Sequence, residues 1–405
     1  MLDKVKIDSH SIVHLSLAAS YQSEQGQHSD VMHFEKFNVW RDIDLLPQDM
    51  QQSILGQQDG FKQTFNYTVG ELLVPYDGNM LHCISHQQFN RDPRPGLHIE
   101  PRVGRFYPRG WFGGIGGAFS EDMHPARLVG LEDGRMFVDF NHPLAEYSID
   151  LTLQVHGINS QFNEHGGRCN DTIADLLTGP GMQLRYRGQP TDFIVDDPFS
   201  RVDASLDGAF YAMPRMTDHL DATALQQLAA CYAELVPRQA RVLDLMSSVN
   251  SHLSRVVDTE QVVGLGMNRQ ELEANSRLDE RVIHDLNQDP VLPFENESFN
   301  VVVCSLSVEY LVKPQDVLAE VARVLEPGGL FIVSFSNRWF PPKVISLWTQ
   351  LHEFERMGLV SDYMLSSGCF DQVKSRSLRG LPRPEDDRHA LPLSDPLYLV
   401  WGRCR

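Results

Sequence analysis

The stretch VLDLMSSVNSHL, residues 242–253, has the pattern of a buried strand that runs into a tight turn and then a helix. From about residue 222 to 335, apolar strand-like runs alternate with amphipathic helical segments. This alternation predicts a parallel sheet covered by helices on both faces. Two extended segments, near 363–378 and 396–402, are expected to close that sheet as an antiparallel edge pair. The turn is unusual because it lacks glycine, which lets a backbone approach a ligand closely.

Length and composition limit the classes of protein to consider. A chain of 405 residues is expected to form roughly two domains of about 150–200 residues each. With 42% hydrophobic and 22% charged residues, and no apolar run near the ~20 residues of a membrane helix, we expect a soluble protein that does not span a membrane. The charged first residues, MLDKVKIDSH, argue against a secretory signal and predict a cytoplasmic location.

Charge and cysteine usage exclude further classes. The formal net charge of -19 disfavours nucleic acid as a partner, because that affinity comes mainly from lysine and arginine. Six cysteines without a CxxC pair predict free thiols rather than a zinc knuckle or disulfide framework. We therefore expect no metal site, although sixteen histidines leave a metal-handling protein as a minor alternative.

The domain boundary is expected where the periodicity changes. Residues 1–158 alternate apolar and polar residues as half-buried strands do, with one short helix within LPQDMQQSILGQQDG. RFYPRGWFGGIGGAFSEDMHPA breaks this pattern and predicts an irregular loop or mobile flap, inserted at about 75–130. Residues 159–204 are predicted to form a polar linker and lid, and residues 205–405 to form the second domain.

Several stretches of the second domain carry a family resemblance. VLDLMSSVN, VVGLGMN, LPFENESFNVVVCSLSVEYL and EVARVLEPGGLFIVSFSN together resemble the type 11 group of class I S-adenosylmethionine-dependent methyltransferases over about residues 205–405. The resemblance implies an α/β Rossmann-like fold and S-adenosyl-L-methionine as the cofactor. A fold resemblance does not by itself establish an activity.

The resemblance assigns the first turn to the methionine part of the cofactor. Asp244 matches the acidic residue that opens this motif. Where the family has glycines, the chain has Met246, Ser248 and Asn250. Serine is small and asparagine tolerates positive φ, so a Ser247-Ser248 turn is still expected to approach a cofactor.

The next two loops are assigned to the ribose and the adenine. After the second strand the family has an acid that binds both ribose hydroxyls, whereas this chain has Gly266, Met267 and Asn268. Losing such an acceptor weakens binding by about 1.5–3 kcal/mol unless Asn268 replaces it. Asp285 and Leu286 match the pair that contacts adenine.

Candidate catalytic residues precede the first strand of the second domain. FYAMPRMTDHLDATAL places Tyr211, Arg215 and His219 before a helix that Asp221 is positioned to cap. His219 is a candidate base or substrate-orienting residue, with a histidine near a helix cap as the alternative. Arg215 is a candidate carboxylate clamp, with a solvated or salt-bridged arginine as the alternative. In the family's geometry further side chains face the cleft. They are Ser305, Ser307, Glu309, Tyr310, Asn337, Arg338 and Trp339, and Ser305 is counted among the cofactor contacts.

The first domain resembles the FKBP class of prolyl isomerases in its SlyD-type form, which carries an inserted flap domain. The resemblance lies in VHLSLAASYQSEQGQ, DLLPQDMQQSILGQQDGFKQTFNYTV and VDFNHPLAEYSIDLTLQVHGI. It implies an α+β fold, with an aromatic pocket for which Phe34, Phe37 and Trp40 are candidates beside their alternative role in the core. The histidine-rich tail of that form is missing, so nickel binding is not implied.

The sequence therefore predicts a methyltransferase that acts on a small molecule or peptide, with the FKBP-like domain binding or presenting the substrate. The alternative is a prolyl isomerase or chaperone whose methyltransferase fold is a non-catalytic binding module. Neither hypothesis involves nucleic acid or a membrane, and the oligomeric state stays open.

Overall fold

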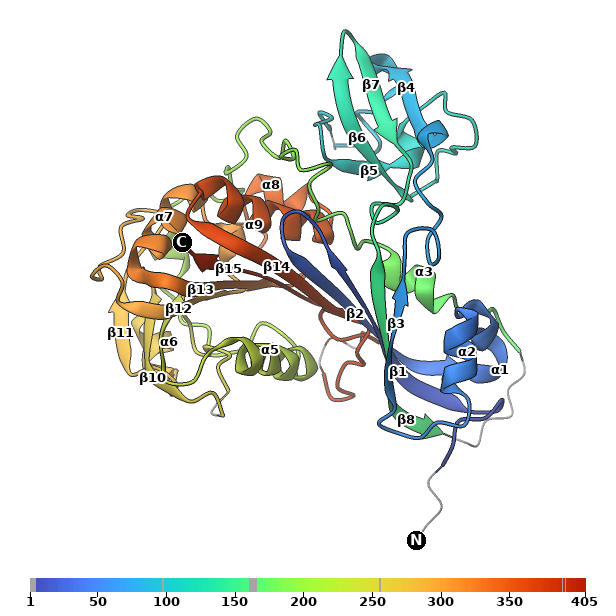
Figure 1. Ribbon diagram of the computed structural model, residues 1–405. Helices are drawn as coiled ribbons and strands as arrows, with labels where there is room; N and C mark the ends of the chain where they lie inside the picture. The colour runs from blue at the N-terminus through green and yellow to red at the C-terminus, as the bar shows by residue number, and fades with distance from the viewer. Residues whose placement is uncertain (1–4, 97, 160–165, 255, 388, 390) are drawn as a thin grey trace.

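The computed structural model describes residues 5–96, 98–159, 166–254, 256–387, 389 and 391–405 (Figure 1). Its strands are β1 (Ile12–Gln22), β2 (Gln27–Asn38), β3 (Lys62–Tyr67), β4 (Leu81–Ser85), β5 (Phe106–Pro108), β6 (Pro125–Glu132), β7 (Arg135–Asp139), β8 (Ile149–Asn159), β9 (Ala240–Leu245), β10 (Thr259–Gly266), β11 (Glu280–Ile283), β12 (Phe299–Ser305), β13 (Leu325–Phe335), β14 (Phe370–Arg379) and β15 (Leu397–Cys404). Its α-helices are α1 (Val39–Asp42), α2 (Gln48–Ile54), α3 (Thr172–Leu177), α4 (Asp207–Phe210), α5 (Ala222–Leu235), α6 (Arg269–Ala274), α7 (Pro314–Val324), α8 (Ser346–Thr349) and α9 (Glu353–Ser367).

The second half has the predicted α/β architecture. Strands β11, β10, β9, β12 and β13 lie side by side and run parallel. Their central residues are fully buried, as Val301, Val302 and Val303 of β12 show, because apolar side chains cover both faces of the sheet. Asp221 caps α5 by accepting from the amides of Thr223 and Ala224, and so fixes the start of the predicted helix. This is the open α/β arrangement that the sequence predicts for the second half.

The C-terminal strands do not form the expected edge of the sheet. Residues 363–367 belong to α9, and β14 begins only at Phe370. β15 pairs antiparallel with β13 and β14, but β14 also pairs in parallel with β2 of the first half. One eleven-stranded sheet, β11-β10-β9-β12-β13-β15-β14-β2-β1-β8-β3, therefore runs through both halves (Figure 1). The added partner satisfies backbone groups that an edge strand would leave open.

The turn after β9 does not lead into a helix, contrary to the prediction from VLDLMSSVNSHL. The chain is irregular from Met246 to Ser254. Met246 and His252 both have positive φ, 58° and 57°, which an α-helix does not allow. Asn250 instead accepts a hydrogen bond from the amide of His252, a local turn that competes with helix formation.

The first half consists of two parts. β2, β1, β8 and β3 form the far end of the long sheet and enclose an apolar core with α1, α2 and α3. β4, β7, β6 and β5 form a separate sheet that stands apart in Figure 1. The stretch predicted to be an irregular flap contains β5 and a core of its own, in which Tyr107 and Phe112 are buried. The FKBP resemblance of this half stays a prediction.

The middle of the predicted linker is buried. Part of it, 160–165, lies outside the described residues, but Gly179 to Leu184 are buried without interruption. The Gln183 amide donates to the Tyr21 hydroxyl, at 2.5 Å, and the buried Arg127 donates to the Leu184 carbonyl, at 2.8 Å. The segment thus lies between the two sheets, and its buried backbone groups find protein partners in place of water.

Candidate cofactor and acceptor site

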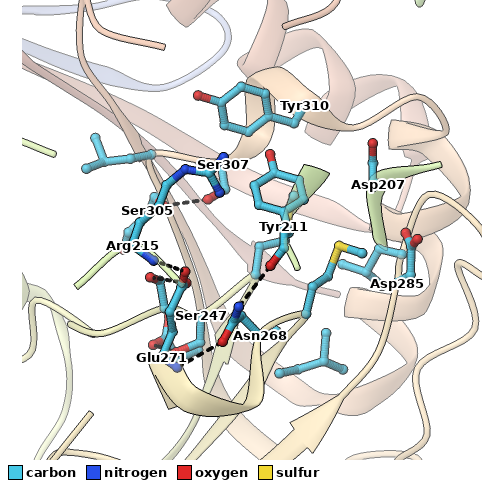
Figure 2. A pocket seen from close by; sticks show the side chains of 18 of the residues that line it. Asp207, Tyr211, Arg215, Ser247, Asn268, Glu271, Asp285, Ser305, Ser307 and Tyr310 are labelled. Atoms are coloured by element: carbon cyan, nitrogen blue, oxygen red, sulfur yellow. Dashed lines mark hydrogen bonds between the residues drawn. The ribbon is translucent and has the colours of Figure 1, made fainter. Parts of the chain in front are cut away.

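One cavity lies at the carboxyl ends of β9, β10, β11 and β12, where open parallel sheets bind ligands. The structure brings every residue predicted to bind the cofactor or to act in catalysis to this cavity, although no ligand tests their roles. These residues are Tyr211, Arg215, His219, Asp244, Met246, Ser247, Ser248, Gly266, Met267, Asn268, Asp285, Leu286 and Ser305. Figure 2 labels several of them. The sequence analysis missed several other lining residues, namely Asp207, His252, Leu265, Glu271, His284, Asn287, Leu306 and Phe340.

The turn after β9 has the positive φ that glycine usually adopts, although it contains no glycine. Met246 occupies the first expected glycine position at φ 58°, where a side chain other than glycine is strained. Asp244 is buried at the base of the turn and accepts a hydrogen bond from the Ser247 hydroxyl, at 2.5 Å. Burial raises the pKa of Asp244 to about 6, although hydrogen bonds from Ser247 and Ser251 lower it in part.

Gly266 has no room for the acidic side chain that the family carries at this place. A Cβ atom at residue 266 would lie 2.2 Å from the carbonyl oxygen of Ser247. The Ser247 amide donates to the Leu265 carbonyl, which holds the turn close against the end of β10. A side chain at residue 266 would therefore require the turn at Ser247 to move.

Asn268 has a structural role that the sequence analysis did not foresee. Its carbonyl oxygen caps α6 by accepting from the amides of Gln270 and Glu271. Its amide nitrogen donates to the carbonyls of Tyr211, at 2.9 Å, and Ala212, at 3.2 Å. Both ends of the side chain are engaged, so Asn268 would have to release a partner before it could bind a ribose.

Glu271 is the acidic residue that the cavity has in place of one at residue 266. It lies in the first turn of α6 and is 7% exposed. One carboxylate oxygen accepts from the backbone amide of Arg215 and the other from the Ser248 hydroxyl, both at 2.7 Å. The asparagine cap with an acid three residues later is a helix-start pattern that could have drawn attention to it.

The far end of the cavity has a free carboxylate oxygen. Asp285 uses Oδ1 to accept from the amides of Asn287 and Gln288. Among the described residues its Oδ2 has no hydrogen-bond partner. The buried Leu286 follows it, and Figure 2 shows Asp285 on the opposite side of the cavity from Glu271. This arrangement fits an adenine, whose exocyclic amine needs an acceptor and whose ring needs an apolar surface.

The three candidate catalytic residues come from residues 203–219, which we call the cover segment. Arg215 lies among aromatic rings, with its guanidinium carbon 4.5 Å from the centroid of Phe210 and 5.0 Å from that of Phe340. Its Nη1 is buried and has no partner among the described residues. The alternative of a salt-bridged arginine therefore does not describe this side chain.

Burial also shifts the pKa values of the other two candidate catalytic residues, His219 and Tyr211. It lowers the pKa of His219, whose ring packs edge-on against Phe340 at 5.2 Å. Burial raises the pKa of Tyr211, with the Asp207 carboxylate acting in the same direction. At neutral pH His219 is therefore neutral and able to accept a proton, while Tyr211 keeps its own proton.

Some side chains predicted to face the cleft do not reach it. Glu309 is 1% exposed outside the cavity, and burial raises the pKa of its carboxyl to about 8. Arg338 pairs with Asp395, at 3.1 Å, and Trp339 packs against Arg356. Asn337 also lies outside the lining, whereas Ser305, Ser307 and Tyr310 belong to it. The Ser305 hydroxyl bonds to buried Tyr232, at 2.6 Å, so its side chain is engaged in the core.

The described residues contain neither a metal-ligand cluster nor a membrane-spanning helix. No group of three or more histidine, cysteine, aspartate or glutamate side chains is arranged to hold a metal ion there. Over the same residues, no helix combines the length and apolar character that crossing a membrane requires.

Comparison with known proteins places a methyltransferase domain in the second half. Residues 247–333 match the family described as methyltransferase domain. A malonyl-[acyl-carrier protein] O-methyltransferase of Marinomonas sp. (strain MWYL1) is 29% identical over 87 residues, 22% of this chain and 31% of that protein. A ubiquinone/menaquinone biosynthesis C-methyltransferase UbiE of Dinoroseobacter shibae is 38% identical over 80 residues, 20% of this chain and 31% of that protein. The chain thus spans about a third of the length of these relatives.

Solved structures also resemble part of this chain. One from Thermotoga maritima, a possible histamine N-methyltransferase, has 16% identity, covers 45% of this chain and 89% of that chain, and gives a TM-score of 0.34. The YcgJ protein of Bacillus subtilis has 15% identity, covers 44% of this chain and 99% of that chain, and gives a TM-score of 0.33. The sequence matches support a class I methyltransferase domain, and no relative here extends that assignment to the first half.

Proposed function

We propose that the protein is an S-adenosylmethionine-dependent methyltransferase that binds its donor in the cavity described above. The observation that carries the proposal is the convergence of the loops after β9, β10 and β11 on one cavity, within a half that matches a methyltransferase domain. Asp285 and Leu286 would hold the adenine, and Asp244, Ser247 and Ser248 would lie under the methionine part. Met267 would lie beside the adenosine, next to Asn268.

The bound donor would supply a methyl group on a positively charged sulfur. The chain has to align an acceptor atom with that methyl group and take up the acceptor's proton, because methyl transfer depends mainly on positioning. His219 is neutral and can accept the proton, and Tyr211 can donate a hydrogen bond to the acceptor. The relatives include an O-methyltransferase and C-methyltransferases, and a proton acceptor serves both kinds of acceptor atom.

Arg215 favours an acceptor that carries negative charge. Its guanidinium lies among rings with Nη1 buried and has no carboxylate partner among the described residues, so an anion in the cavity would compensate its charge. The proposed acceptor is therefore a small molecule or peptide with a carboxylate or a similarly charged oxygen near the methylated atom.

The first half is proposed to bind or present that acceptor. Among the described residues, none before Asp207 lines the cavity. We therefore assign the first half no part in the methyl transfer itself. The first half has a groove of its own, about 940 Å³, that includes Leu46, Leu73, Arg109 and Met123. A peptide or a tethered acceptor held there would need a free end that reaches the cavity.

Isothermal titration with S-adenosylmethionine and S-adenosylhomocysteine tests the proposal. We expect saturable binding that Asp285→Ala weakens by about tenfold, since a charge-assisted hydrogen bond contributes about 1.5–3 kcal/mol. Asp289→Ala is a matched control, because this exposed acid of the same loop accepts from the Val291 amide and lies outside the cavity lining. Absence of binding at millimolar ligand would overturn the proposal.

A further inference from the structure

The cover segment has little regular structure of its own. Within residues 203–219 the one α-helix is α4, which is four residues long. Its outer side is open to solvent, with Leu206 74% and Met213 77% exposed. Its position over the cavity therefore depends on contacts with the rest of the chain. The buried Lys343 anchors the start of the segment by donating to the carbonyls of Asp203 and Ser205.

Three asparagines supply such contacts, one from each loop that the proposed function assigns to the donor. Asn250, after β9, donates to the Asp218 carboxylate at 2.9 Å. Asn287, after β11, donates to Asp207 at 2.8 Å. The third is Asn268, after β10, which donates to the Tyr211 and Ala212 carbonyls. All three asparagines also line the cavity.

A fourth contact reaches the backbone of a candidate catalytic residue. Glu271 accepts from the Arg215 amide and, with its other oxygen, from Ser248 in the loop after β9. In Figure 2 the dashed lines from Asn268 to Tyr211 and from Arg215 to Glu271 run directly between the donor loops and the cover segment. The same side chains thus face the donor and hold the residues that would face the acceptor.

We infer that Asn250, Asn268 and Asn287 are positioning residues that couple donor binding to the assembly of the acceptor side, so that the acceptor binds after the donor. This inference rests on the proposed function. A ligand that orders the three loops also orders the cover segment, and the coupling is reciprocal because both events draw on the same free energy. Tyr211, Arg215 and His219 would reach their working positions only in the donor-bound protein.

Hydrogen exchange of the full chain, measured by mass spectrometry with and without S-adenosylhomocysteine, tests the coupling. Peptides within 203–219 are the readout, because they contain the Arg215 amide that Glu271 accepts. In the wild type we expect saturating ligand to slow their exchange by at least about fivefold, the lower end of typical couplings between sites.

Asn268→Asp separates the coupling from the binding. Aspartate keeps the oxygen that caps α6 but loses the amide that donates to Tyr211 and Ala212. We expect the protection of 203–219 to be lost in this variant even at ligand concentrations that saturate it, so that a change in its affinity does not enter the comparison.

Asn275→Asp is the matched control. Asn275 donates to Ser248 and Ser251 of the same donor loop and makes no hydrogen bond to the cover segment among the described residues. This variant is expected to bind less tightly and to keep the protection at saturation. Protection that survives in Asn268→Asp, or ligand binding without protection in the wild type, overturns the coupling alone. Absence of binding in the wild type overturns the proposed function together with it.

Discussion

Two buried aspartates show how differently the two regions of the long sheet use a buried charge. Asp30 lies where the halves meet and accepts from the Tyr21 hydroxyl, at 2.8 Å, the Ser377 hydroxyl, at 2.7 Å, and the Gln183 amide, at 3.4 Å. Asp244 lies beneath the cavity. Burial raises the pKa of both carboxyls above the ordinary range of aspartate.

The difference lies in what the partners connect. The donors to Asp30 come from the first sheet, the buried linker and β14, so its network joins three parts of the chain. The donors to Asp244, Ser247 and Ser251, belong to its own turn. Hydrogen bonds to a buried carboxyl therefore join parts of the chain at one place and hold a strained turn in position for a ligand at the other.

The largest effect is expected from Asp30→Ala. The substitution leaves the buried Tyr21 and Ser377 hydroxyls without their acceptor, and each orphaned group costs about 1–3 kcal/mol. We expect the free energy of unfolding in urea to fall by about 3 kcal/mol. Ser377→Ala, which removes one donor and keeps the carboxylate, should cost about 1 kcal/mol; equal losses for both would contradict the network.

Asp244→Asn is expected to change the stability of the protein in the opposite direction and to stabilise it at high pH. The folded-state pKa of Asp244 is about 6, above its ordinary value of 3.8, so the carboxyl binds its proton more tightly in the folded chain. Its contribution to stability is therefore full below pH 4 and is lost as the pH rises through 6. At pH 8 the variant should be more stable than the wild type by about 3 kcal/mol, because asparagine does not ionise.

Thermal unfolding of both proteins from pH 4 to pH 8 measures this difference. The two curves should converge at the acid end, and donor binding at pH 8 should weaken in the variant. A difference in stability that does not change with pH would show that Asp244 does not titrate in this range.

The smallest effect is expected from Gly266→Ala. The added methyl group would meet the Ser247 carbonyl, and shifting that backbone should cost about 1–2 kcal/mol of stability. Titration with S-adenosylhomocysteine should also weaken, since the displaced turn carries Ser247 and Ser248. Gly328→Ala serves as a control for the same chemical change, because a Cβ there meets nothing within 4 Å, apart from the strain of its own positive φ of 78°. An unchanged affinity in Gly266→Ala would separate the turn from the cavity.

Much of the site could be predicted because chain order fixes the carboxyl ends of parallel strands. Once β9, β10, β11 and β12 were recognised from their apolar runs, the residues that follow each strand had to meet at one edge. Asp285 needed no further information for its placement. Asp207 could not be found in this way, because its position depends on an ion pair with Lys343, which is distant in sequence. The Lys343 Nζ atom lies 3.2 Å from Asp207 Oδ1.

The sequence by itself determined the parallel strands β9 to β13, the α/β class of the second half and the loops that line the cavity, since these follow from local periodicity and strand order. It did not determine the irregular chain after β9 or the helical residues 363–367. The tertiary structure alone decided the pairing of β14 with β2, the burial of residues 179–184 and the hold of three asparagines on the cover segment. Those features depend on which backbone and amide groups lack a local partner. These groups find their partners only when distant parts of the chain are packed together.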